Sequence, residues 1–158
     1  MRIGFGTDIH RLATGRPLII GGVRIEADFG ADGHSDADVL MHAAADAVLG
    51  ALALGDLGTH FPNDEDKWRD ADSSQFLRYA VGLIEGKGYR VANFDSVVNL
   101  ERPKLGPHID RMRANLAAAM NIDIDCVSVK AKTGEGVDAI GKLEAVRAEA
   151  IILLRKSE

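Results

Sequence analysis

Three side chains in this chain could bind one metal ion. Asp8 and His10 lie two residues apart in a segment that predicts a strand, and alternate side chains of a strand point to the same face. His42 lies in a segment that predicts a helix, so it can reach the same ion from across a cleft. One carboxylate and two imidazoles suit zinc, and three protein ligands leave one coordination position for a substrate. The set is therefore typical of a catalytic metal site.

The same helical segment offers a simpler interpretation of His42. Asp38, His42 and Asp46 recur every four residues and line one face of a helix, and such a stripe is often only solvated surface. Taken alone, this pattern favours an ordinary surface histidine. Its combination with Asp8 and His10 favours the metal site, because a strand and a helix then both offer polar groups to one cleft.

Two further segments contain groups that could bind phosphate. His34 comes just before the predicted helix, where free backbone N–H groups and the helix dipole favour an anion. A loop residue that only shapes the turn is an equal alternative. The segment 130–136 places Lys132, Thr133 and Glu135 beside two glycines at the end of a strand. It could bind a diphosphate and a hard cation such as magnesium, or it could be a polar loop without a ligand.

The segment 100–107 connects a strand to a helix and contains two prolines, Pro103 and Pro107. Because proline restricts the backbone, free N–H and C=O groups in this segment could contact the edge of a flat base. On composition alone, a rigid connector is the better interpretation.

The composition is that of a globular domain. The 158 residues are 46% hydrophobic and 27% charged, which is enough to bury a core and predicts a single domain over residues 1–158. The net charge is −5 and the basic residues are scattered, which argues against a nucleic-acid partner. Cys126 is the only cysteine, so an intramolecular disulfide is excluded and a buried, inert thiol is expected.

No segment predicts a membrane span or a secretory signal. The longest purely apolar run, residues 151–154, is too short to cross a bilayer, and the opening residues lack the apolar core of a signal peptide. We therefore expect no membrane partner. The expected location is the bacterial cytoplasm, or a plastid if a transit peptide has been removed.

Hydrophobic periodicity and turn residues divide the chain into strands and helices. The first helix is predicted to begin at Ser35, whose hydroxyl could cap it, and to end near Leu54. Loops are expected over 26–34 and over 56–71, the second long enough to be a functional flap. The remaining elements are strands over residues 1–12, 18–20, 23–25, 89–101, 124–131 and 143–155, and helices that begin at residue 72 or 73 and at Pro107.

The last strand indicates how the elements pack. One of its faces is apolar at positions 146, 148, 150, 152 and 154, and the other ends in Ile151 and Leu153, too apolar to be fully solvated. Helices on one sheet face and partner subunits on the other would explain this pattern. We expect an α+β fold: a two-layer α/β sandwich with a mostly four-stranded mixed sheet and helices on one face.

These motifs, in this order and at this spacing, resemble the 2-C-methyl-D-erythritol 2,4-cyclodiphosphate synthase family of the non-mevalonate isoprenoid pathway. The resemblance covers nearly the whole chain. Its most specific part is HSDADVLMH (34–42) joined to the upstream DIH (8–10). The matching stretches are GFGTDIHRL (4–12), PLIIGGVRI (17–25), residues 33–66, ADSS (71–74), RPKLGPHIDRMRANL (102–116) and VKAKTGEG (129–136).

The resemblance implies an enzyme of isoprene biosynthesis, a phosphorus–oxygen lyase. It implies that 4-diphosphocytidyl-2-C-methyl-D-erythritol 2-phosphate is cyclised to 2-C-methyl-D-erythritol 2,4-cyclodiphosphate with release of CMP. It further implies a homotrimer in which the sheets meet and the active sites lie between adjacent subunits. The implied cofactors are Zn²⁺ at Asp8, His10 and His42, and Mg²⁺ or Mn²⁺ at Glu135.

The resemblance also implies which residues act on the substrate. His34 and Thr133 match residues that stabilise the transition state. A larger set is implied to contact the methylerythritol, the phosphates or the cytidine, or, over residues 61–65, to form the flap. That set is Asp8, Ile9, His10, His34, Ser35, Asp56, Leu57, Gly58, Phe61, Pro62, Asn63, Asp64, Glu65, Leu100, Glu101, Arg102, Pro103, Lys104, Leu105, Gly106, Lys132, Thr133, Gly134, Glu135 and Lys142.

The chain departs from the common family pattern after Glu135. Ala139 stands where phenylalanine is frequent, Lys142 stands where arginine is frequent, and Asp138 replaces a usual glycine. Lys142 keeps the positive charge but lacks the planar fork of arginine.

Two other functions would use the same residues. A metal-dependent nucleotide-diphosphate hydrolase would bind the same ions but admit water to the phosphorus. A non-catalytic trimeric module would only hold the metal.

Overall fold

The computed structural model describes residues 1–62 and 65–157. Its centre is a five-stranded sheet in the order β4-β1-β7-β5-β6. The β1–β7 and β7–β5 pairs are antiparallel and the β5–β6 pair is parallel, so the expected mixed sheet is confirmed. Four of the strands are long or of medium length, and β4 is a short fifth one. The strands are β1 (Arg2–Thr14), β4 (Phe29–Ala31), β5 (Tyr89–Asn99), β6 (Val127–Lys132) and β7 (Ala145–Lys156).

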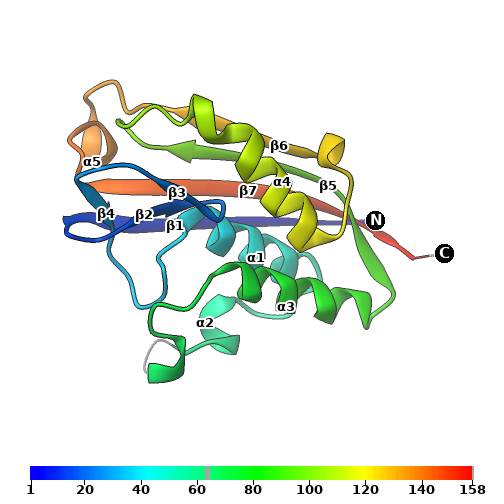
Figure 1. Cartoon of the computed structure of the whole chain (residues 1–158). Coiled ribbons are helices and arrows are strands. Elements are labelled where there is room, and N and C mark those ends of the chain that lie inside the picture. Colours follow the sequence, from blue (N-terminus) through cyan, green and yellow to red (C-terminus); the bar gives the residue numbers. More distant parts are fainter. Residues whose placement is uncertain (63–64, 158) are drawn as a thin grey trace.

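Three helices cover one face of this sheet (Figure 1). They are α1 (Val39–Ala51), α3 (Ser74–Glu85) and α4 (Ile109–Met120). α1 packs directly on β1 and β7, and α3 packs against α1. The expected two-layer α+β architecture is confirmed. No helix in the described part of the chain combines the length and the apolar character that crossing a membrane requires.

The expected hairpin forms as β2 (Leu18–Ile20) and β3 (Val23–Ile25). Other short elements correct the expected loops. β4 lies within 26–34 and pairs with the end of β1, while α2 (Leu57–His60) and the 3₁₀ turn η1 (Asp66–Trp68) lie within 56–71. Elements this short carry no periodic signal, and unlike the β2–β3 hairpin, which has a glycine turn between two apolar runs, these three have no turn motif that reveals them.

The start of α1 differs from the sequence-based expectation. The helix begins at Val39 and its cap is Asp38, whose carboxylate accepts N–H bonds from Leu40 and Met41, both at 3.1 Å. Ser35 therefore does not cap it. Asp38 is the cap because its carboxylate also accepts hydrogen bonds from the N–H groups of Gly21 (2.9 Å) and Gly22 (2.6 Å) in the β2–β3 turn. The local sequence does not encode this contact with a distant segment. The helix also ends at Ala51, three residues before Leu54.

We expect Asp38→Asn to destabilise the fold by about 2–4 kcal/mol, because the amide NH₂ group would face backbone N–H donors and leave at least one of them buried and unpaired. Urea unfolding measures this loss. Asp110→Asn, at a position with 92% of the side chain exposed, is the matched control and should shift the unfolding free energy by less than about 0.5 kcal/mol. Equal stability of the Asp38→Asn protein and the wild type would contradict the capping role.

Two glycines let α1 lie against the backbone of β1. A Cβ atom at Gly4 would lie 1.8 Å from the carbonyl oxygen of Ala47, and one at Gly6 would lie 2.1 Å from that of Ala43. Neither distance is sterically possible, so only glycine permits this packing. Because Asp8 continues the same face of β1, the close approach brings it beside the α1 residue His42.

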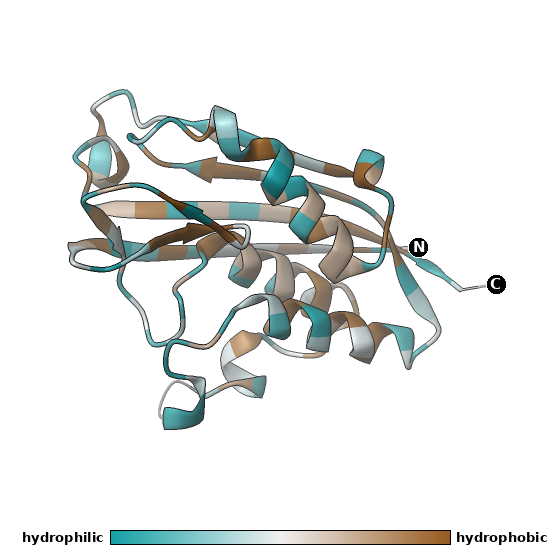
Figure 2. Cartoon of the chain, viewed as in Figure 1, coloured by the Kyte–Doolittle hydropathy of each residue, from teal (hydrophilic) through white to brown (hydrophobic). Residues whose placement is uncertain are grey.

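No helix of the described residues lies over the other face of the sheet (Figure 2). Apolar side chains of β1 and β7 are exposed there in the single chain: Ile3 (72%), Phe5 (59%), Ile9 (56%) and Ile151 (52%). By contrast, the β7 residues of the helix-covered face, from Val146 to Leu154, are buried, as expected. A contiguous exposed apolar face of this kind is characteristic of protein–protein contact.

Candidate metal centre and active site

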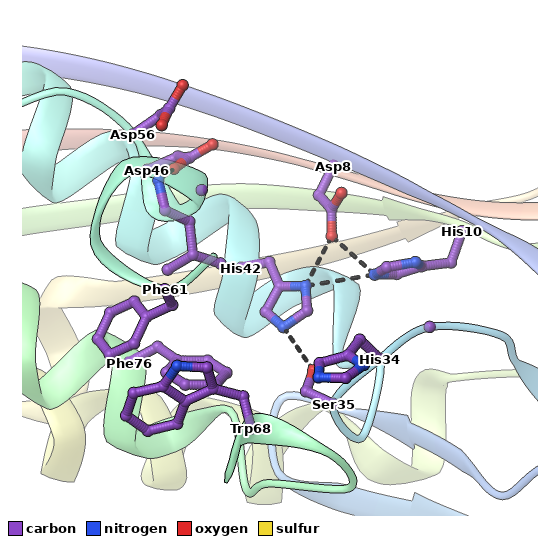
Figure 3. Close-up of a pocket in the computed structure, with 13 residues that line it drawn as sticks. Asp8, His10, His34, Ser35, His42, Asp46, Asp56, Phe61, Trp68 and Phe76 are labelled. Atoms are coloured by element: carbon purple, nitrogen blue, oxygen red, sulfur yellow. Dashed lines mark hydrogen bonds and ion pairs between the residues drawn. The ribbon is translucent and has the colours of Figure 1, made fainter. Parts of the chain in front are cut away.

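The three predicted metal ligands converge in the structure (Figure 3). Asp8 Oδ2 lies 2.9 Å from His42 Nδ1 and 3.0 Å from His10 Nε2, and the two ring nitrogens lie 3.2 Å apart. Asp8 and His10 point from the same face of β1, and His42 points toward them from α1. Alternation along a strand and the glycine-mediated approach of the helix together produce this geometry.

This donor set fits a zinc-like ion. In a tetrahedral site with ligand bonds of about 2.0–2.1 Å, neighbouring ligand atoms lie about 3.3 Å apart, close to the spacing observed here. The three side chains are largely buried, with 11% to 26% of each exposed. All three side chains also line the adjoining cavity, so an ion bound to them would have one coordination position open toward it, as a catalytic metal requires.

The electrostatics of the group also favour a cation. Burial alone would raise the pKa of Asp8, but hydrogen bonds and positive charge from His10 and His42 hold it well below its usual range. Burial alone would lower the pKa of His42, but the hydrogen bond and charge of Asp8 raise it above its ordinary value. Asp8 is thus ionised and available as an anionic ligand at any physiological pH.

The raised pKa of His42 leads to a pH prediction. A metal ion must displace the proton on the ligating nitrogen, so we expect Zn²⁺ affinity to fall as the pH drops below that pKa, by about tenfold per pH unit for one proton. Competition titrations against a chromophoric chelator between about pH 8 and pH 6 measure this slope. An affinity independent of pH over this range would contradict the assignment of His42 as a ligand.

The metal group opens into a cavity of about 420 Å³. The cavity contains many of the residues that the sequence resemblance assigns to the substrate. Its lining residues are Asp8, His10, Gly33, His34, Ser35, His42, Asp46, Asp56, Leu57, Gly58, Phe61, Trp68 and Phe76.

One wall of the cavity is aromatic, and sequence reasoning missed most of it. The ring centroid of Phe61 lies 4.5 Å from that of Phe76 and 5.0 Å from that of Trp68. The ring centroids of Phe76 and His42 lie 6.1 Å apart. Phe76 fits the apolar stripe of α3, so its sequence position suggests only core packing. Trp68 lies in the expected flap, where nothing in the sequence indicates which way it points.

Asp46 is a further cavity residue outside the predicted set. Its carboxylate accepts the N–H of Leu57 at 2.7 Å, which ties α1 to the start of α2. Burial raises the pKa of Asp46 although this hydrogen bond lowers it, and the charges of Asp56 and Asp8 raise it further. The four-residue spacing from His42 is a signal that could have placed it in the site.

His34 and Asp56 lie at opposite parts of the cavity lining. The His34 ring contacts the flap, with Nε2 3.0 Å from the carbonyl oxygen of Glu65. Asp56 caps α2 and accepts hydrogen bonds from the N–H and hydroxyl of Thr59, at 2.8 and 2.7 Å. These bonds hold the pKa of the exposed Asp56 carboxyl below its usual range. Its free oxygen is thus an ionised acceptor for a ligand hydroxyl.

Most of the remaining predicted residues form a second cluster, the nucleotide-end cluster, at the ends of β5 and β6. It comprises residues 100–106, Lys132–Glu135 and Lys142. The N–H of Gly134 donates to Glu101 Oε2 at 2.8 Å, and the Thr133 hydroxyl donates to Glu135 Oε1 at 2.7 Å. None of these residues lines the metal cavity of the same chain. Glu135 and Lys142 are exposed, and Lys142 directly follows the short helix α5 (Asp138–Gly141).

A few predicted residues lie elsewhere. The Ile9 side chain points to the helix-free face, so only its backbone lies beside the metal group; its N–H donates to Asp8 Oδ1 at 2.9 Å. Pro62 follows Phe61 but does not line the cavity. Asn63 and Asp64 are outside the described residues.

A model of the YgbB family matches residues 1–155. The chain belongs to the YgbB family. The 2-C-methyl-D-erythritol 2,4-cyclodiphosphate synthase of Salinibacter ruber is 55% identical to this YgbB family member over 157 residues, which is 99% of this chain and 100% of that protein. The synthase of Neisseria gonorrhoeae is 49% identical over 154 residues, 98% of this chain and 96% of that protein. The family resemblance stated from the motifs is confirmed.

Solved structures agree with this membership of the YgbB family. A 2C-methyl-D-erythritol-2,4-cyclodiphosphate synthase in a CDP-bound form has a TM-score of 0.90 and 42% identity, covering 98% of this chain and 100% of that one. The bifunctional IspDF from Campylobacter jejuni has a TM-score of 0.95 and 34% identity over 99% of this chain, which corresponds to 42% of the bifunctional chain. The fold class expected from the sequence is confirmed by these matches.

Proposed function

We propose that this YgbB family member is a 2-C-methyl-D-erythritol 2,4-cyclodiphosphate synthase. It would convert 4-diphosphocytidyl-2-C-methyl-D-erythritol 2-phosphate to 2-C-methyl-D-erythritol 2,4-cyclodiphosphate and release CMP. The observation that carries the proposal is the convergence of Asp8, His10 and His42 at an open cavity. It occurs in a chain that is 55% identical over 157 residues to a synthase of this name.

We assign Zn²⁺ to the group of Asp8, His10 and His42, and Mg²⁺ or Mn²⁺ to Glu135. When bound, these ions supply positive charge that offsets the charge developing on the diphosphate. The donor chemistry supports the division, since imidazole suits zinc whereas an exposed carboxylate beside phosphate oxygens suits magnesium.

The reaction needs no protein nucleophile. An oxygen of the 2-phosphate attacks the β-phosphorus of the same molecule, a new P–O bond closes the ring, and the bond from the β-phosphorus to the bridging oxygen breaks, so that CMP departs with that oxygen. The main task of the protein is to fold the substrate back on itself and hold the two phosphates together. In this proposal, N–H of His34 and the hydroxyl of Thr133 donate to oxygens that gain charge in the transition state.

The cavity supports roles for the other residues. Asp56 has a free carboxylate oxygen for the methylerythritol hydroxyls, beside Leu57 and Gly58 at the start of α2. The aromatic wall of Phe61, Trp68 and Phe76 would exclude water that could otherwise hydrolyse the same bond. Lys132 and the backbone of residues 100–106 would hold the cytidine and its phosphates.

A homotrimer would complete the site. The metal cavity and the nucleotide-end cluster are separate within one chain, and the exposed apolar face carries Phe5 and Ile151 opposite each other in the β1–β7 register. We propose that three chains join through this face. The nucleotide-end cluster of one chain would then complete the metal cavity of its neighbour.

The decisive experiment is incubation of the purified protein with the substrate, Zn²⁺ and Mg²⁺, followed by ³¹P NMR. We expect the cyclic diphosphate and CMP in equal amounts, and no product when a chelator removes both metals. A linear phosphate product would instead identify a nucleotide-diphosphate hydrolase. No turnover with both metals supplied would favour a metal-binding module without catalytic activity.

A further inference from the structure

A buried chain of hydrogen bonds lies behind His42, on the side of the ring away from Asp8. His42 Nε2 lies 2.7 Å from the Ser73 hydroxyl oxygen and 3.2 Å from that of Ser35 (Figure 3 draws the second contact). His42 Nδ1 faces Asp8 at 2.9 Å. The two ring nitrogens therefore have different partners: Nδ1 points to Asp8 in the metal group, and Nε2 points to the hydroxyls of Ser73 and Ser35.

The chain continues from Ser73 to a carboxylate. The Ser73 hydroxyl lies in hydrogen-bond contact with Asp36 Oδ1, and the Ser73 backbone N–H donates to Asp36 Oδ2 at 3.1 Å. Asp36 Oδ1 also accepts the N–H of Asp38 at 3.2 Å. Ser73 is fully buried, so no water competes for its hydroxyl. Asp36 thus links the start of α3, through Ser73, to the residue that caps α1.

The chemistry of these groups fixes the direction of each bond. An ionised carboxylate only accepts, so the single hydroxyl proton of Ser73 goes to Asp36. The Ser73 oxygen can then only accept from His42 Nε2, 2.7 Å away, which places a proton on Nε2; the Ser35 hydroxyl, 3.3 Å from the same oxygen, can also donate to it. The Nδ1 lone pair is left facing the metal group, and the ring is held in one orientation.

The position of Ser73 in α3 supports a role outside that helix. Ser73 is the N-cap residue of α3, yet its hydroxyl makes no capping hydrogen bond to the helix. A serine at this position normally uses its oxygen for the first-turn N–H groups. Here the oxygen contacts His42, 31 residues earlier in the chain.

We propose that Ser73 and Asp36 are positioning residues for the metal centre, which select the Nδ1-binding form of His42 and fix its ring. The inference rests on the metal site of the proposed function and deepens it. Neither residue would touch the metal or the substrate. Partners of this kind behind a metal-bound histidine typically change metal affinity by about 10- to 100-fold.

The test compares Ser73→Ala with a matched control, Ser74→Ala. Ser74 is also buried, but no residue in the described part of the chain forms a hydrogen bond with its hydroxyl. Zn²⁺ affinity of the chelator-treated full chain is measured by competition, and Co²⁺ is added separately to record its visible absorption. We expect Ser73→Ala to weaken Zn²⁺ binding by about 10- to 100-fold and to alter the Co²⁺ spectrum. Ser74→Ala should match the wild type, and Ser73→Thr should restore most of the affinity.

Asp36→Ala is the second variant and keeps the test decisive if Ser73→Ala does not fold. Without the carboxylate, the Ser73 hydroxyl is free to donate to His42 Nε2, which favours the form of the ring that cannot bind through Nδ1. We expect about tenfold weaker Zn²⁺ binding. Wild-type affinity in the folded variants would overturn the positioning role alone. Failure of the wild type itself to bind Zn²⁺ would overturn the metal site and this inference with it.

Discussion

His42→Ala is expected to abolish Zn²⁺ binding and to lower turnover of the cyclisation by about 10³-fold or more. The substitution removes one of three ligands. The two that remain, the Asp8 carboxylate and the His10 ring, are too few to hold the ion against competition from water. Loss of a metal that stabilises transition-state charge by several kcal/mol corresponds to a rate loss of this size. Metal content by mass spectrometry and turnover by CMP release measure the two effects.

His108→Ala is the matched control for this prediction. His108 lies at the start of α4 and does not line the metal cavity, so the variant should keep wild-type zinc content and turnover. Circular dichroism must show that both variants are folded. A His42→Ala protein that retains one zinc per chain and full turnover would refute the metal mechanism.

Phe5→Asp is expected to produce a folded monomer that still binds Zn²⁺ but turns over substrate about 100-fold more slowly, or slower still. Phe5 is 59% exposed in the single chain, so a charge there leaves the core intact but opposes burial of the apolar sheet face. The three proposed zinc ligands all come from one chain and should remain together. In the proposed trimer a monomer would lack the neighbour's nucleotide-end cluster, and misplacement of substrate by about 1 Å already costs about 100-fold in rate.

Analytical ultracentrifugation, zinc titration and CMP release separate the three outcomes. Ile124→Asp is the matched control, since Ile124 is also an exposed apolar residue (38%) but lies in the 3₁₀ turn η3 (Ile124–Cys126), outside the sheet. We expect it to remain trimeric and active. A wild-type monomer, or a Phe5→Asp monomer with full turnover, would refute a site shared between subunits.

The sequence predicts the metal group because its geometry depends on short, regular spacings. Asp8 and His10 share a strand face through their two-residue separation, and His42 needs only a helix that packs on that face. The strand and the helix follow from local patterns, whereas the close packing of the helix on that face depends on Gly4 and Gly6. The buried face of β7 follows from the same alternation.

Other features depend on contacts between distant segments and were not predictable. The cap of α1 is Asp38 and not Ser35 because the β2–β3 turn donates to the same carboxylate. β6 begins at Val127, later than expected, because η3 occupies the preceding residues. Trp68 joins the cavity wall only through its packing on Phe61 and Phe76, which no spacing in the sequence encodes.

The backbone contact between β1 and α1 has a consequence for how the ion is taken up. With only hydrogen atoms at Gly4 and Gly6 between the strand and the helix, the ligand spacing is set by main-chain geometry and not by the rotamers of intervening core side chains. We therefore expect the donor atoms of Asp8, His10 and His42 to keep this spacing without a bound ion, so that metal binding requires little rearrangement of the main chain.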